Sequence, residues 1–541
     1  MEFTYRQRRE RASSAQRSVV MGRRGMAASS QPLATLAGYR ALSKGGNAVD
    51  AAVAMVSTLS VVEPFSVGIG GDAFALLYLA GENKRIGMNA SGRAPYRANA
   101  KWFEEKGMRD IPERGILPVT VPGALQGWAE AVQRYGRLTL GDAFEDAICY
   151  AEQGYPVTEV ISGEWKNSEA ILLSHESAAK AYLIDGKTPR PGQVFFNKDL
   201  ARTYKTIVRE GVGAFYEGDI CDAIVAFSNR HGGLLSRKDF KDHTTTWVDP
   251  ISTDYRGYTI YELPPNGQGL VALEMLNILE GYDIGNLEHN GHEYLHFLIE
   301  AKKAAFSDRD CFITDPEFEA IPVAELLSKE YAGKAREKID RTRAQPPVLP
   351  SSRQRNSDTV YVTAVDKDRN AVSFISSIFL HFGSGMVVDG TGIILHNRGK
   401  SFCLDPKRFN RIEPHKRPMH TIIPGMCFKD ESFLMTFGVM GADMQPQGHV
   451  QFLVNLIDFK MNLQEAMDAP RARHTEGMEI YLEEGIPEET VSALGKRGHH
   501  VIHGNPATNQ VGGGQAIYLD SDQGVLLGAS DRRKDGCAIG Y

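Results

Sequence analysis

Thr359 stands where a threonine can act as a nucleophile. The preceding segment, residues 341–358, contains three prolines and many polar side chains, so it should form an exposed loop rather than a helix or strand. Residues 359–366 are rich in β-branched side chains, residues 366–370 are typical of a turn, and residues 371–377 predict a second strand. A loop that leads into a hairpin beginning with threonine is the arrangement that a self-cleaving nucleophile requires, although the local pattern alone predicts only a loop and a hairpin.

The hydroxyl of a threonine is a weak nucleophile and needs a base beside it. If the chain is cut before Thr359, the new α-amine, with an ordinary pKa of about 7.7–8.0, can accept the hydroxyl proton. Before the cut the same nitrogen belongs to an amide and cannot act as a base, so the uncut chain should be inactive. Attack on an amide carbonyl creates an oxyanion, which backbone N–H groups can stabilise.

A second pattern with chemical meaning runs from His292 to His296, where Glu293 follows the first histidine. On a helix the two histidines would share one face, as they do in zinc proteases. The apolar residues that follow also recur at helical spacing, as in a structural helix. A zinc protease is therefore retained only as a minor alternative, and we expect no metal or other cofactor in the main reaction.

The composition is that of a globular protein able to form a large core. Of 541 residues, 42% are hydrophobic and 24% are charged. The net charge of −6 gives no reason to expect a nucleic acid or an anionic membrane as partner. The longest apolar run, residues 51–62, is too short to span a bilayer, which needs about 20 residues, and predicts a buried helix.

The cysteines and the N-terminal residues indicate the cellular compartment. The six cysteines lie far apart without metal-binding spacing, and free thiols are typical of a reducing compartment. No apolar signal-peptide core follows Met1. We therefore expect a cytoplasmic protein whose residues 1–20 form a basic, flexible arm.

Several short motifs together resemble the γ-glutamyltranspeptidase family. Each is weak alone, but they occur in family order along almost the whole chain. They are Gly45–Ala52, Val61–Pro64, Gly68–Asp72, Val121–Gly123, Asp254–Tyr258, Pro264–Pro265, Val365–Asp368, Arg417–Pro418, Ala469–Arg471 and Gly528–Asp531.

The resemblance implies an α+β fold, the four-layer αββα sandwich of the N-terminal nucleophile hydrolases. It also implies a precursor that cuts itself between Asp358 and Thr359. Residues 1–358 would then be the large subunit and residues 359–541 the small catalytic subunit, together forming one αββα unit. The resemblance leaves open whether two such heterodimers associate.

The resemblance also assigns roles around the nucleophile. The paired-glycine loop of the family matches Gly441 and Ala442, whose N–H groups would stabilise the oxyanion; alanine supplies the same N–H as glycine. Ser377 falls where the family has a threonine that supports the nucleophile. With Thr359, these residues form the expected catalytic set.

The substrate pocket departs from the family pattern. Ser91 and Ser401 replace the arginine and aspartate that bind the α-carboxylate and α-ammonium of a γ-glutamyl group. Phe379 replaces an asparagine, and His420 and Thr421 replace a pair of serines. Because a buried ammonium needs a carboxylate partner, this pocket does not suit glutamate.

The basic residues near the same motifs suggest an anionic substrate. Arg398, Arg93 and His420 are candidate partners for a small carboxylate, since guanidinium groups bind carboxylates in bidentate geometry. The sequence thus favours hydrolysis of a small carboxylate-bearing amide, with oxamate, cleaved to oxalate and ammonia, as leading candidate. Three alternatives remain open: a γ-glutamyltransferase or glutathione hydrolase, a glutaryl-type acylase, and a family member that binds a ligand without turnover.

Overall fold

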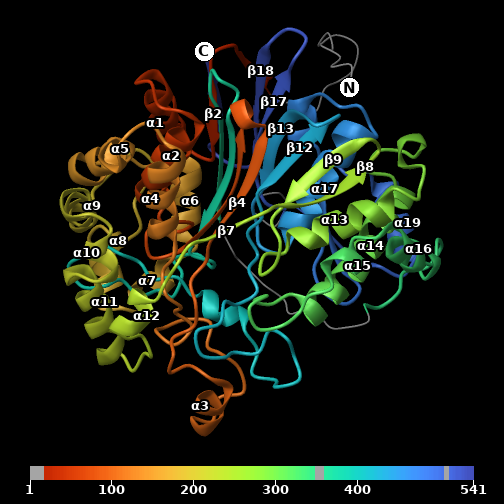
Figure 1. Cartoon of the computed structure of the whole chain (residues 1–541). Coiled ribbons are helices and arrows are strands. Elements are labelled where there is room, and N and C mark those ends of the chain that lie inside the picture. The colour runs from red at the N-terminus through yellow and green to blue at the C-terminus, as the bar shows by residue number, and fades with distance from the viewer. Residues whose placement is uncertain (1–16, 348–358, 505–510) are drawn as a thin grey trace.

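Two seven-stranded antiparallel sheets pack face to face at the centre of the computed structural model, which describes residues 17–347, 359–504 and 511–541 (Figure 1). Sheet I has the order β1 (Val20–Gly22), β18 (Val525–Ser530), β17 (Gly514–Asp520), β13 (Ser432–Val439), β12 (Gly425–Lys429), β9 (Tyr258–Glu262) and β8 (Ile251–Tyr255). Sheet II has the order β19 (Cys537–Gly540), β2 (Met26–Ser29), β10 (Val360–Val365), β11 (Ala371–Ser377), β3 (Asp72–Leu79), β4 (Lys84–Ala90) and β7 (Thr246–Val248).

Strand β10 is buried on both faces, and its side chains alternate between two cores. Val360 and Val362 pack toward the helices outside sheet II. Tyr361 and Val365 enter the core between the sheets. Because side chains alternate along a strand, Thr359 falls on the same side as Tyr361, between the sheets.

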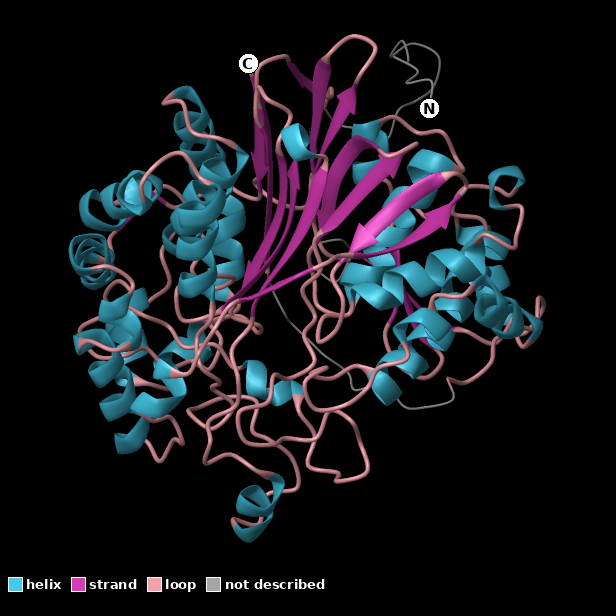
Figure 2. Cartoon of the chain, in the orientation of Figure 1, coloured by secondary structure: helices cyan, strands magenta, loops and turns pink. Residues whose placement is uncertain are grey.

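Helices cover the outer face of each sheet, which completes four layers (Figure 2). Sheet II is covered by α1 (Pro32–Ser43), α2 (Ala48–Val62) and α4 (Ala124–Tyr135), with α5 (Leu140–Gln153) packed on α2. Sheet I is covered by α13 (Gly269–Leu279), α17 (Met444–Ile457) and α18 (Leu463–Asp468), with α14 (His292–Phe312) packed on α13. The αββα prediction is confirmed.

The remaining elements surround this sandwich. Two smaller sheets contain β14 (Ala472–His474), β15 (Glu479–Glu483) and β16 (His500–Gly504), and β5 (Tyr155–Pro156) with β6 (Val194–Phe195). The other helices are α3 (Ala100–Glu105), α6 (Glu159–Lys166), α7 (Glu169–Leu173), α8 (Glu176–Tyr182), α9 (Lys198–Glu210), α10 (Gly213–Tyr216), α11 (Asp219–Arg230), α12 (Arg237–Lys241), α15 (Val323–Leu326), α16 (Lys329–Glu337), α19 (Glu488–Lys496) and the 3-10 helices η1 (Ala80–Glu82), η2 (Ile284–Asn286) and η3 (Arg398–Ser401).

The elements predicted from local patterns are present. The expected hairpin is β10–β11, and the apolar run forms α2, all of whose residues are buried. Among the described residues, no helix is both long and apolar enough to cross a membrane. Most of the expected N-terminal arm, residues 1–16, lies outside the described residues.

Segments before and after Thr359 share both sheets. In sheet II, β10 pairs with β2 on one side and with β11 on the other. In turn, β11 pairs with β3, which comes from the first part of the chain. The residues on either side of the predicted cut thus belong to one unit.

Candidate active site

Thr359 and Ser377 meet at one end of the β10–β11 hairpin. Thr359 directly precedes β10 and is fully buried, and its Oγ1 donates a hydrogen bond of 3.2 Å to Ser377 Oγ. The same Ser377 oxygen accepts the N–H of Phe379 at 2.8 Å. This geometry brings the expected nucleophile to its expected supporting hydroxyl. Asp358, on the other side of the expected cut, lies outside the described residues.

Asp72 lies opposite Ser377 on the neighbouring strand β3 and organises two histidines. Its Oδ1 accepts the N–H of Gly92 at 2.8 Å. Its Oδ2 lies 3.1 Å from His420 Nε2 and 3.2 Å from His396 Nδ1. Burial raises the pKa of the Asp72 carboxyl, but the two imidazoles outweigh burial and hold that pKa below its ordinary value.

The hydrogen bonds of His420 define its tautomer. Its Nδ1 accepts the N–H of Ile422 at 3.3 Å, so its Nε2 carries the proton and donates to Asp72. Burial, with the nearby charge of Arg398, lowers the pKa of His420 to about 3. At neutral pH this imidazole is uncharged, which argues against the expectation that it supplies positive charge to a substrate.

Arg398 is a buried cation with open hydrogen-bond donors. Its Nη1 donates to Thr421 Oγ1 at 3.0 Å, and its guanidinium carbon lies 4.0 Å from the centre of the Phe379 ring. Among the described residues, its Nε and Nη2 have no hydrogen-bond partner. Burial lowers the pKa of Arg398 to about 9, so the side chain remains charged at neutral pH. Because a buried charge is costly unless it is paired and hydrogen-bonded, this site favours binding of an anion.

Phe379 holds the guanidinium from a strained backbone position. Its φ is +77°, a region that bulky residues rarely adopt. The Ser377 hydroxyl bonds its N–H, and its ring stacks on Arg398. Phe379 therefore links Ser377 to the buried cation, in addition to filling space.

The loop of Gly441 and Ala442 connects β13 to α17 in left-handed conformations, with φ of +123° and +51°. In the part of the chain that the structure describes, neither N–H donates a hydrogen bond. The loop is held from behind by Gly512, whose φ is +69°; a Cβ there would lie 1.9 Å from the carbonyl oxygen of Met440. Two free N–H groups on a fixed loop have the character of oxyanion donors.

Gln268 and Arg309 connect that loop to the pocket. Gln268 Nε2 donates to the carbonyl oxygens of Ala442 at 2.9 Å and Thr421 at 2.7 Å. Arg309 Nη1 donates to Gln268 Oε1 at 3.2 Å and to Asp443 Oδ1 at 2.6 Å. A continuous series of contacts thus runs from Thr359 through Arg398 and Thr421 to the Gly441–Ala442 loop.

Sequence reasoning missed four residues of this network: Asp72, His396, Gln268 and Arg309. Asp72 closes the Gly68–Asp72 motif, so a charged residue at a predicted strand end was an available signal. The other three carry no local signature, because their partners are distant in sequence.

Arg93 does not join this network. Its guanidinium is paired with Asp315 at 3.2 Å and with Glu317 at 2.9 Å. Because both carboxylates already compensate its charge, the structure gives no support to Arg93 as a substrate ligand.

The zinc-protease pattern does not form a converged ligand pair. His292 is exposed at the first residue of α14, whereas His296 is fully buried. His296 Nδ1 lies 2.9 Å from His499 Nε2, and its Nε2 donates to the carbonyl oxygen of Asp340 at 2.7 Å. Both nitrogens of His296 are thus engaged away from His292, so the zinc-protease alternative has no support.

The fold and the family comparison together define an N-terminal nucleophile hydrolase. The Gamma-glutamyltranspeptidase family model matches residues 34–541, and the chain belongs to that family.

Known proteins are similar over nearly the full length. The glutathione hydrolase-like YwrD proenzyme of Bacillus subtilis is 39% identical, over 96% of this chain and 99% of that protein. The oxamate amidohydrolase proenzyme of Klebsiella pneumoniae is 32% identical, over 96% and 98%. Among solved structures, the crystal structure of cephalosporin acylase from Bacillus halodurans superposes with a TM-score of 0.92 over 98% of each chain. The two sequences are 42% identical.

Proposed function

We propose that this chain is a precursor that cuts itself between Asp358 and Thr359, and that Thr359 then hydrolyses an amide whose acyl group carries a carboxylate. The observation that carries the substrate proposal is Arg398, a fully buried guanidinium with two nitrogens unpartnered among the described residues. It is linked to Thr359 through Phe379 and Ser377.

The catalytic cycle follows from these positions. Thr359 Oγ1 attacks the amide carbonyl while the α-amine of Thr359 takes its proton, and the N–H groups of Gly441 and Ala442 stabilise the oxyanion. The amine then returns the proton to the leaving nitrogen, which departs as ammonia or an amine. Water, deprotonated by the same α-amine, cleaves the resulting ester and releases the acid.

The shared sheets support a precursor that stays together after the cut. Hydrogen bonds between β10 and β2, and between β11 and β3, would join residues 359–541 to residues 1–358. The two named relatives are also proenzymes. All six cysteines are free, which supports the expected cytoplasmic location.

The charges around Arg398 favour an anion over a zwitterion. Ser401 is neutral, and the nearby Asp72 is engaged by His396, His420 and Gly92. A γ-glutamyl substrate would bring an ammonium group, and neither Ser401 nor the engaged Asp72 offers a free carboxylate to receive it. These features disfavour the glutathione hydrolase alternative.

Two acyl groups fit a carboxylate-binding arginine. Oxamate places its carboxylate directly on the reacting carbonyl, so anchoring the anion would also fix that carbonyl against Thr359. The bulky Phe379 beside Arg398 favours such a short acyl group. A glutaryl amide, already an alternative from the sequence, is the second candidate, because the chain is also similar to an acylase, at 42% identity.

A series of monoamides tests the proposal. Ammonia release would be measured from oxamate, malonamate, succinamate and glutaramate, with acetamide as the uncharged control. A charge-assisted contact of about 1.5–3 kcal/mol predicts a kcat/KM for the best anion about tenfold to a hundredfold above that of acetamide. Fastest release from glutaramate would favour the acylase, and equal rates for acetamide would refute the anion site. Turnover of none of them by fully cut protein would point to a binding protein.

A further inference from the structure

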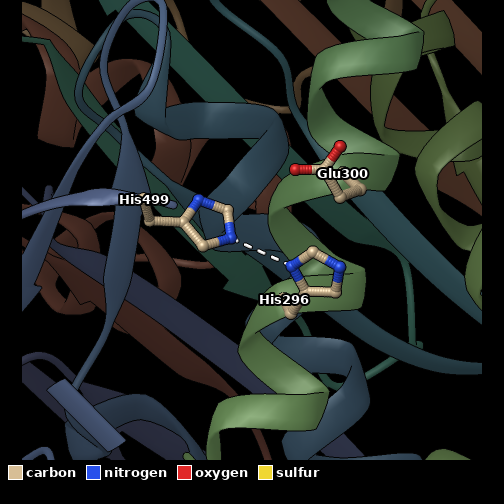
Figure 3. Close-up of side chains that lie close together, drawn as sticks. All are labelled: His296, Glu300 and His499. Carbon is tan, nitrogen blue, oxygen red and sulfur yellow. Dashed lines mark hydrogen bonds between the residues drawn. The ribbon is translucent and has the colours of Figure 1, made fainter. Parts of the chain in front are cut away.

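Three buried side chains with metal-binding donor atoms, His296, Glu300 and His499, lie close together (Figure 3). All three are distant from Thr359 in the sequence. His296 and Glu300 lie one turn apart on the same face of α14. His499 lies between α19 and β16. One donor atom of each residue lies within 4.8 Å of the others, and the three residues are 0%, 4% and 3% exposed. The site described above uses none of them.

The hydrogen bonds of His296 prepare its Nδ1 as a donor atom. Its Nε2 carries a proton, because it donates to the carbonyl oxygen of Asp340 at 2.7 Å. Its Nδ1 therefore has a free electron pair, which accepts a hydrogen bond from His499 Nε2 at 2.9 Å. A distal N–H held by a backbone carbonyl is the usual support of a metal-binding histidine.

The third donor, Glu300, is held in a similar way. Lys303 Nζ donates to Glu300 Oε1 at 2.7 Å and to the carbonyl oxygen of Gln345 at 2.7 Å. Lys303 and Arg497 bring positive charge close to the histidines. That charge opposes ions held mainly by electrostatic attraction, such as Ca²⁺ and Mg²⁺. It is a smaller obstacle for ions that bond strongly to imidazole nitrogen.

We propose that His296 Nδ1, His499 Nε2 and a Glu300 oxygen bind one Zn²⁺ or similar divalent transition-metal ion, with water as fourth ligand. Nitrogens on a tetrahedral zinc ion lie about 3.3 Å apart, so the histidine pair must open by a few tenths of an ångström. The proton of His499 moves from Nε2 to Nδ1, which has no partner among the described residues.

The location suggests what the ion would do. His296 and Glu300 belong to residues 1–358 and His499 to residues 359–541, so a bound ion would join the two subunits. That consequence rests on the proposed cut, whereas binding itself does not.

The test is a titration of the full, tag-free protein with Co²⁺ after treatment with a chelator. We expect one ion per chain, with the visible absorption of a four- or five-coordinate cobalt site, lost on addition of Zn²⁺. His499→Ala and Glu300→Gln should abolish stoichiometric binding. His292→Ala and His500→Ala alter exposed histidines nearby and should leave it unchanged. The Thr359→Ala protein should bind as wild type does, which separates this outcome from any failure of self-cleavage.

Two results would overturn the site. One is wild-type protein that binds no stoichiometric cobalt, a result that needs no variant. The other is an unchanged cobalt spectrum in His499→Ala. If circular dichroism shows that a variant is unfolded, the wild-type titration and the His292→Ala comparison decide.

Discussion

Arg398 is the residue from which we infer the substrate. Its guanidinium is fully buried, and two of its nitrogens have no hydrogen-bond partner among the described residues. Arg398→Ala should raise KM for an anionic amide about tenfold to a hundredfold, the range expected for a charge-assisted hydrogen bond. Arg398→Lys should recover only part of this, since lysine cannot form the bidentate contact. Initial-rate kinetics on the best monoamide measure both effects.

The control for that prediction uses the uncharged substrate and a surface arginine. The KM for acetamide should change little in Arg398→Ala. Arg230→Ala, which removes an exposed arginine paired with Asp389, should behave as wild type. An equal rise of KM for acetamide would mean that Arg398 shapes the pocket and does not bind a carboxylate.

Single residues differ in how far their roles can be predicted from sequence. The positions of Thr359, Ser377, Gly441 and Ala442 follow from the ordered motifs, and the structure brings Thr359 to Ser377. Whether a basic residue can bind a substrate depends on partners that sequence does not reveal. Arg93 is paired with carboxylates more than two hundred residues away, and His420 donates its hydrogen bond to Asp72.

Among the secondary-structure elements, α14 contacts the proposed oxyanion loop of Gly441 and Ala442 through Arg309 and Gln268. Gln268→Ala removes the hydrogen bonds to both Ala442 and Thr421. Because the direct loss of an oxyanion donor costs about 10²–10³ in kcat, an indirect loss of alignment should cost roughly tenfold, with little change in KM. Steady-state kinetics separate the two parameters.

Gln126→Ala is the matched control for Gln268→Ala. It removes a half-buried glutamine on α4 whose side chain, within the part of the chain that the structure describes, bonds only its helical neighbour Glu130, and kcat should be unchanged. Should Gln268→Ala raise KM and leave kcat intact, the glutamine would hold the pocket but not the oxyanion loop.

Local sequence patterns predict helices and strands better than they predict which strands pair with one another. The β10–β11 hairpin and α2 follow from short-range spacing and composition, because a turn and an apolar run are local features. The pairing of Val365 in β10 with Met26 in β2 joins distant segments. Such a register depends on which faces the assembled layers bury, so the order of strands in each sheet required the structure.

At the scale of the whole molecule, buried neutral histidines predict sensitivity to acid. Burial lowers the pKa of His243, His420, His449 and His499 to about 3. In the unfolded chain imidazoles take up protons near pH 6.5. Between pH 6.5 and 3 the unfolded state therefore binds more protons, and stability falls as the pH is lowered through that range. Each histidine contributes a slope of up to about 1.4 kcal/mol per pH unit.

Thermal unfolding measured from pH 7 to pH 4.5 tests this prediction. The midpoint temperature should fall steadily below about pH 6. His292→Ala, which removes an exposed histidine, should give the same pH profile. A midpoint temperature that stays constant down to pH 4.5 would show that these histidines are not buried in their neutral form.

The first residue of the small fragment decides whether Thr359 becomes a chain terminus. Intact-mass analysis and N-terminal sequencing of purified wild-type protein should find two chains, the smaller beginning at Thr359. Thr359→Ala should remain a single inactive chain. Thr363→Ala alters another buried threonine of β10 and should still be cut. A single-chain wild-type protein that hydrolyses amides, or a cut at another residue, would show that Thr359 is not the N-terminal nucleophile.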